Sequence, residues 1–127
     1  MTTTVKFLIE KVDGGYTAYA KERAAFTEGD TLSELKQNIK DVLEMQCEHL
    51  NADVNDLAVE LVYDIPAFFD AFAFINTKSF AERIGMNYKL LNNYTQRVKK
   101  PGAKQKERIE HGIQSIIKEL RAVHVAI

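Results

Sequence analysis

Apolar and polar residues alternate along the first part of the chain in the pattern of β-strands. Between Thr3 and Val12 every second residue is apolar, so one face of the segment is apolar and the other is mixed. The sequence Asp13-Gly14-Gly15 follows, and glycine adopts the positive φ that tight hairpin turns require. Alternation resumes over residues 16–21, and residues 24–27 form a short third apolar segment. The pattern predicts a β-hairpin followed by a short strand.

The apolar period then changes from two residues to about 3.6, which indicates an amphipathic helix. Asp30 or Thr31 is suited to cap its start, and Thr31 with Glu34 has the spacing of a capping box. The stripe expected to face the sheet comprises Leu35, Ile39, Val42, Leu43, Gln46, Cys47 and Leu50. After a polar turn, residues 57–63 alternate again. We therefore expect a small βββαβ domain over residues 1–66.

From residue 67 the pattern is helical. The Phe-rich segment 67–74 carries little charge, and we interpret it as the first helix of a second, all-α domain over residues 67–127. Further helices are expected from Asn76 or Thr77 to Ile84, from Asn87 to about Val98, and over residues 104–123. The predicted fold class is α+β.

Two of these short helices have the spacing of a helix-turn-helix. Gly85 begins a three-residue turn, Ala81 lies four positions earlier where the helices must cross closely, and Leu91 anchors the second helix. Residues 75–102 resemble the helix-turn-helix of phage-repressor-type regulators. In that motif the second helix enters the major groove of DNA with its N-terminal residues toward the base edges.

The outer side of the second helix carries amide, aromatic and basic side chains and no acid. Asn and Gln pair with adenine, whereas Lys and Arg prefer guanine or phosphate. Lysines flanking the motif suit phosphate contacts. The alternative is an ordinary solvated helix face, on which acids would be expected. The predicted DNA-binding residues are Thr77, Lys78, Asn87, Tyr88, Lys89, Asn92, Asn93, Gln96, Arg97, Lys99 and Lys100.

Charge also divides the chain, near residue 72. The net charge of −1 is the sum of −8 over residues 1–72, with 6 basic and 14 acidic residues, and +7 over residues 73–127, with 11 basic and 4 acidic residues. The basic half suits a polyanion. Cys47 is the only cysteine, which excludes an intrachain disulfide and a cysteine-based zinc site. No apolar stretch approaches the ~18 residues of a membrane span, so we expect a cytosolic protein that binds no membrane.

Three segments in the first half resemble the HicB antitoxin family: FLIE at 7–10, DGGYTA at 13–18 and FTEGDTLSEL at 26–35. At 21–25 the chain has KERAA where the family often carries a Pro-containing loop. The resemblance implies a truncated ribonuclease H-like domain without catalysis. It also implies a small, basic, mRNA-cleaving HicA-like toxin as partner, and a DNA-binding C-terminal domain that regulates the operon.

Other candidate chemistry is weaker. The three histidines lack partners at metal-ligand spacing, so we expect neither metal nor cofactor. Glu10, Asp13, Asp64 and Asp70 are imaginable ligands of a nuclease, which would make the chain an RNA-acting enzyme; we expect no enzyme. Three tyrosines, at 16, 19 and 63, either pack on the sheet or contact the toxin.

The sequence thus predicts an antitoxin that occludes a basic toxin and represses its own operon as a homodimer or higher oligomer. The last helix has an Ile/Leu stripe, which we assign to the core and to a dimer interface. The alternative is a stand-alone transcriptional regulator whose first domain binds a ligand or dimerises.

Overall fold

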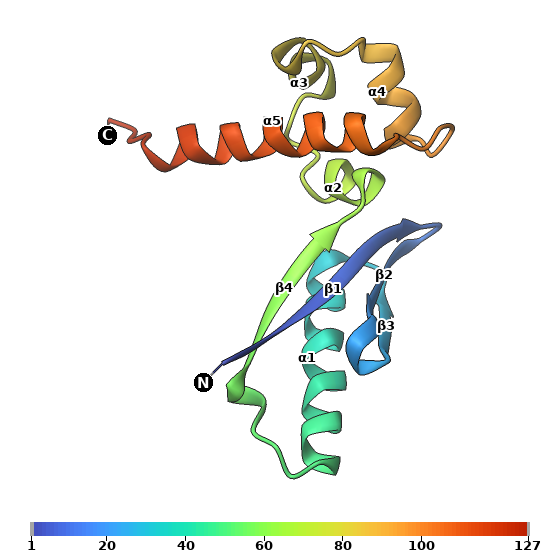
Figure 1. Ribbon diagram of the computed structural model, residues 1–127, viewed down its shortest axis with the longest axis vertical. Helices are drawn as coiled ribbons and strands as arrows, with labels where there is room; N and C mark the ends of the chain where they lie inside the picture. Colours follow the sequence, from blue (N-terminus) through green and yellow to red (C-terminus); the bar gives the residue numbers. More distant parts are fainter. Residues whose placement is uncertain (1, 127) are drawn as a thin grey trace. The chain divides into compact units, whose positions relative to one another are not determined.

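The computed structural model describes residues 2–126 and has an α+β fold. The four β-strands and the helix that follows the third of them lie in one compact unit that ends at Phe72. A second, all-helical unit begins at Ala73 (Figure 1). We call them the sheet unit and the helical unit. Among the described residues, no helix is long and apolar enough to cross a membrane.

The sheet unit contains four strands in the order β3-β2-β1-β4. Neighbours β1–β2 and β2–β3 are antiparallel, whereas β1–β4 is parallel. A helix therefore connects β3 to β4, as a parallel crossover requires. The strands are β1 (Thr3–Val12), β2 (Gly15–Ala20), β3 (Ala25–Gly29) and β4 (Leu57–Tyr63), with short 3-10 turns at Lys21–Arg23 and Val54–Asp56.

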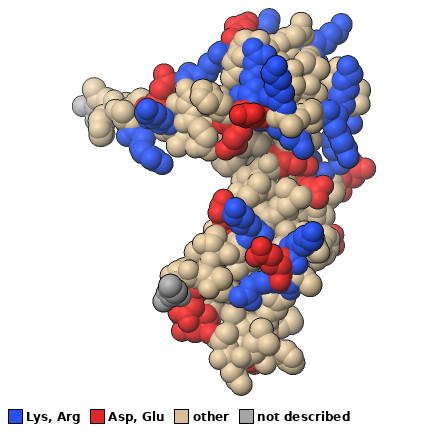
Figure 2. Space-filling view, in the orientation of Figure 1, with Lys and Arg blue, Asp and Glu red and all other residues tan. Residues whose placement is uncertain are grey.

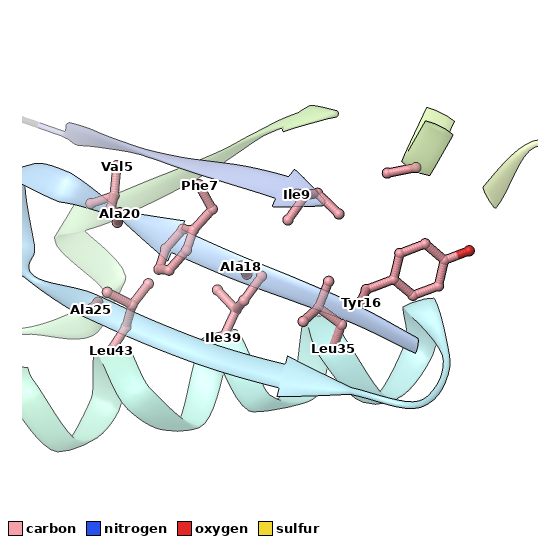
Figure 3. Packing of buried hydrophobic residues seen from close by; sticks show 11 residues of the cluster. Val5, Phe7, Ile9, Tyr16, Ala18, Ala20, Ala25, Leu35, Ile39 and Leu43 are labelled. Carbon is pink, nitrogen blue, oxygen red and sulfur yellow. The ribbon is translucent and has the colours of Figure 1, made fainter. Parts of the chain in front are cut away.

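Helix α1 (Leu32–His49) covers one face of this sheet. Its N-cap is Thr31, whose hydroxyl accepts the backbone N–H of Glu34 at 3.1 Å, as the capping spacing predicts. The core is closed by the inward residues of the strands and by every fourth residue of α1 (Figure 3). These residues include Val5, Phe7, Ile9, Ala18, Ala20, Ala25, Leu35, Ile39 and Leu43. Leu50, expected on the inner stripe, is instead exposed.

Helix α2 (Ile65–Ala71) corrects the predicted domain boundary. The expectation after Pro66 was a new domain, but Ala67 is fully buried in the core of the sheet unit. The Tyr16 hydroxyl also donates a hydrogen bond to Asp70, and the Tyr63 ring contacts the ring of Phe72. The Phe-rich segment completes the first unit, so the boundary lies six residues later than predicted.

The helical unit consists of α3 (Thr77–Ile84), α4 (Tyr88–Thr95) and α5 (Ala103–Arg121). Its buried residues are Phe80, Ala81, Met86, Leu91, Tyr94, Ile109 and Gly112. The predicted stripe of α5 is only partly covered: Ile109 is buried, whereas Leu120 is exposed. Gly112, which the stripe did not include, is where α3 passes closest, because a Cβ there would lie 2.4 Å from Ile84 Cγ2.

Candidate nucleic-acid interface

Side-chain and glycine caps fix where α3 and α4 begin and end. Asn76 Oδ1 accepts the backbone N–H of Ser79 at 2.8 Å, which starts α3. Gly85 ends it with φ +69°, and the N–H of Met86 donates back to Ala81 O at 2.9 Å. Asn87 Oδ1 then accepts the N–H of Lys89 at 2.8 Å and starts α4. Residues 85–87 thus form the three-residue turn that the sequence predicts.

The two short helices pack through the small and apolar positions that the spacing singles out. Ala81 and Leu91 have no exposed surface. Met86, in the turn that joins the two helices, is also buried. A larger residue at 81 would push α3 away from its neighbours, since packed cores accommodate added methylenes poorly. Arg83 on α3 also forms an ion pair with Glu119 on α5.

One side of α4 faces solvent. Tyr88 and Lys89 are exposed, and Asn92 and Asn93, each four residues further along, are half-buried beside them. The opposite side of the helix is closed by Leu91 and Tyr94. We call the four solvent-side residues the α4 face. It presents an aromatic hydroxyl, two amides and one ammonium group, and no carboxylate.

The predicted residues beyond α4 do not continue its helix. We expected α4 to reach about Val98, but it ends at Thr95, and Gln96 and Arg97 lie in the following turn. Arg97 has φ +62°, and the N–H groups of Val98 and Lys99 both donate to Asn93 O. This left-handed residue ends the helix in the way that a glycine often does.

The turn after α4 places the remaining predicted cations in solvent. Gln96, Arg97, Lys99 and Lys100 are exposed. At the start of α3, Lys78 is exposed and Thr77 is half-buried. Asn87 is exposed, but its side-chain oxygen Oδ1 accepts the backbone N–H groups that cap α4. Its side-chain N–H₂ therefore remains for a ligand.

Arg108 was not among the predicted residues, although it lies beside the turn that starts α4. A Cβ on Gly85 would be 3.4 Å from its guanidinium. Arg108 also lines a groove between α3 and α5, whose other charged or titratable lining residues are Arg83, Lys104, His111 and Glu107. Residues 83–106 contain seven Lys or Arg and no Asp or Glu, and blue side chains predominate over the helical unit in Figure 2. Arg108 lies just beyond this segment, after Glu107, so the absence of acids there gives no signal for it.

Two of the four acids considered for nuclease chemistry, Asp64 and Asp70, have other roles in the sheet unit. Asp64 Oδ1 accepts the N–H of Ala67 and caps α2. Asp70 accepts from Tyr16 and lies 3.6 Å from Lys11 Nζ. Burial and the hydrogen bond to Asp70 raise the pKa of Tyr16, in that order of importance. Within residues 2–126, no three His, Cys, Asp or Glu side chains gather as a metal site would require.

Comparison with known proteins finds one informative relative. A segment of 44 residues, 35% of this chain, is 46% identical to a UPF0150 protein of Archaeoglobus fulgidus and covers 67% of that protein. No family model matches the chain. No solved structure matches it either. Because two thirds of the Archaeoglobus protein is matched at this identity, the chain belongs to the UPF0150 protein family.

Proposed function

We propose that the protein is the antitoxin of a type II toxin-antitoxin system. Its sheet unit would occlude a small, basic, mRNA-cleaving HicA-like toxin, and its helical unit would bind operator DNA and repress the operon. The membership in the UPF0150 family supports a HicB-like antitoxin. The truncated ribonuclease H-like character that this resemblance implies suits the βββαβ order of the sheet unit.

The α4 face is the observation that carries the DNA-binding half of the proposal. The N-terminal half of the second helix of a helix-turn-helix reads base edges, and here that half presents Tyr88 and Lys89. Asn92, one turn later, offers the amide geometry that pairs with adenine. Lys99 and Lys100 in the turn after α4 and Arg108 beside Gly85 are exposed and would supply phosphate contacts.

Charge supports the toxin-binding half. The sheet unit carries 14 acidic and 6 basic residues, a net of −8, and attracts a basic protein over long range. Occlusion requires no bond to be made or broken, so the protein would act without catalysis or cofactor. Steering by charge speeds the association, and the contact surface then determines specificity.

Dimerisation would follow from the uncovered end of α5. Ile117 and Leu120 near the end of α5 and Val123 just beyond it are exposed, whereas Ile109 earlier on the helix is buried. A second copy covering them would present two α4 faces to DNA half-sites separated by about 34 Å or a multiple of it.

The DNA-binding proposal is tested with duplex DNA from the region upstream of the protein's own gene. Lys89→Ala and Asn92→Ala should each relax sequence preference by about 1–3 kcal/mol at one base position. Lys100→Ala should instead weaken binding to every duplex and flatten the dependence of affinity on salt. Lys36→Ala, an exposed lysine on α1, is the matched control and should change nothing.

Fluorescence anisotropy with the upstream duplex and a shuffled duplex of equal composition measures these effects. An equal loss on both duplexes from all three helical-unit variants would contradict base reading by the α4 face. Affinity unchanged by every variant would contradict DNA binding through this surface altogether.

A stand-alone transcriptional regulator is the second candidate. The α4 face favours it equally, because DNA reading needs no toxin. In that case the sheet unit would bind a small ligand or only dimerise. Co-purification separates the two: an antitoxin retains the small basic protein encoded beside it, whereas a stand-alone regulator does not.

A further inference from the structure

The sheet has a second face that α1 does not cover. In β1, Val5, Phe7 and Ile9 point to the core, so the intervening residues point the other way. The strand register carries this opposite face across the whole sheet. Leu8 pairs with Tyr19 of β2, and Tyr19 pairs with Phe26 of β3. On its other side Leu8 pairs with Val62 of β4.

These four residues form one continuous line, which we call the apolar row. Phe26, Tyr19, Leu8 and Val62 are 56%, 43%, 41% and 42% exposed, and they come from all four strands in order. Adjacent strands are about 4.8 Å apart, so the row extends roughly 14 Å across the sheet. A one-sided sheet normally presents polar residues to water on its open face. An unbroken apolar line at its centre therefore indicates a surface that another molecule covers.

An acidic row lies beside the apolar row, two residues along each strand. Glu10 pairs with Thr17, and Thr17 pairs with Glu28. Two residues along a strand span about 7 Å. The carboxylates of Glu10 and Glu28 are therefore close enough to Leu8 and Phe26 for a single partner protein to contact both rows. On the other side of the apolar row, Lys6 pairs with Glu60, and these two charges offset each other. The face is thus apolar at its centre and acidic along one margin.

Tyr19 and Phe26, the two aromatic residues of the apolar row, differ from Tyr16 and Tyr63 in what they contact. Tyr16 is buried and donates to Asp70, and Tyr63 packs against the rings of Phe68 and Phe72. Tyr19 and Phe26 are instead adjacent on the open face. Exposed aromatic pairs of this kind are common anchors of protein interfaces.

We propose that the apolar row is the docking surface of the basic partner protein, with Tyr19 and Phe26 as its anchors and Glu10 and Glu28 as its charge-complementary margin. This inference rests on the proposed antitoxin function and assigns that function a surface. A second copy of the chain fits less well, because it would bring together two units of charge −8. The chain's own α4 face is polar and does not match an apolar line.

The test measures binding of the full-length protein to the product of the adjacent gene, by surface plasmon resonance. Tyr19→Ala and Phe26→Ala should each weaken binding by about 30-fold or more, which is the effect of losing an interface hot spot. Met45→Ala is the matched control, because Met45 is an exposed apolar residue on α1, and it should leave affinity unchanged. Upstream DNA binding should be the same for all three variants, and an unchanged urea unfolding midpoint of the sheet unit reports that they fold.

A double variant that removes both carboxylates tests the acidic margin of the docking surface. Glu10→Gln combined with Glu28→Gln should slow association about tenfold at low salt and have little effect at high salt. Glu48→Gln, an exposed acid on α1, should slow association much less.

The outcomes separate the inference from the function on which it rests. If the wild-type protein binds the partner and Tyr19→Ala and Phe26→Ala bind like Met45→Ala, the docking surface is wrong and the antitoxin function stands. If the wild type does not bind, both are wrong. If the two variants change the mass of the protein alone in sedimentation, or tighten its DNA binding, then a second copy or the protein's own helical unit covers the row, and the inference is overturned.

Discussion

Tyr16 shows how a residue on the core face of a strand comes to connect two elements. Alternation puts it on the same side of β2 as Ala18 and Ala20 without saying which side is covered, and all three are buried. Alternation does not predict that its hydroxyl reaches Asp70 of α2, 54 positions later, with Lys11 Nζ 4.9 Å from the centre of its ring. Long-range pairs such as this depend on where α2 returns to the sheet, and local periodicity carries no signal for that.

The hydrogen bond of Tyr16 makes the stability of the sheet unit depend on pH. Its pKa is raised in the folded protein, so the neutral hydroxyl is favoured by folding. The contribution is therefore fully present below the unfolded tyrosine pKa of about 10 and is lost as pH rises above it.

Tyr16→Phe should remove this interaction. We expect a loss of about 1–2 kcal/mol in the free energy of unfolding at neutral pH, because a hydrogen bond to a carboxylate is lost while the ring stays buried. The variant should also lose less stability than the wild type between neutral pH and pH 11. Urea unfolding at the two pH values measures both effects, and equal losses for wild type and variant would contradict this role. Tyr19→Phe, which keeps an exposed ring, is the control.

At the scale of elements, strands and helices follow closely from local pattern. The strand Thr3–Val12, the strand Leu57–Tyr63 and the helix Thr77–Ile84 have the predicted bounds. Capping residues explain why the helix starts are predicted well, because the side chains of Thr31 and Asn76 each accept a backbone N–H at the start of a helix. The Phe-rich α2 was assigned to the wrong unit, since its composition predicts burial without saying against what.

The candidate interface shows the same limit. The residues of the α4 face were predicted from their spacing, whereas Gln96 and Arg97 were placed on a helix that ends before them. A non-glycine residue with positive φ, such as Arg97, is uncommon and leaves no sequence signal. Whether these residues bind DNA stays a prediction.

Gly112 determines how closely α3 and α5 pack. Gly112→Ala would place a Cβ 2.4 Å from Ile84 Cγ2 and 3.2 Å from Phe80 Cζ. Overpacking of this kind costs about 1–3 kcal/mol, and the better helix propensity of alanine offsets about 1 kcal/mol of it. A contact of 2.4 Å favours the upper end of this cost, so we expect a net loss of about 2 kcal/mol in the free energy of unfolding of the helical unit, together with weaker DNA binding.

Thermal unfolding followed by circular dichroism tests this packing. His111→Ala, one residue away and exposed, should change stability by less than about 0.5 kcal/mol. A Gly112→Ala protein as stable as the wild type would show that α3 and α5 do not need so close an approach.

At the scale of the whole molecule, a near-neutral sequence resolves into two units of opposite charge, −8 and +7, whose boundary the fold places between Phe72 and Ala73. Each unit has a proposed partner of opposite sign, a basic protein for the sheet unit and DNA for the helical unit. Charge along the chain predicts this division well, because it needs no knowledge of tertiary contacts. The line of exposed apolar residues across four strands could not be predicted, because it depends on strand register.

The central claim is that the protein neutralises a basic ribonuclease by covering it. The most direct measurement is RNA cleavage by the purified product of the adjacent gene, titrated with this protein. The account predicts that cleavage stops near one sheet unit per toxin, and that Phe26→Ala shifts the titration to higher concentration while Met45→Ala does not. Cleavage that continues at excess protein, or an adjacent gene product that cleaves no RNA, would contradict it.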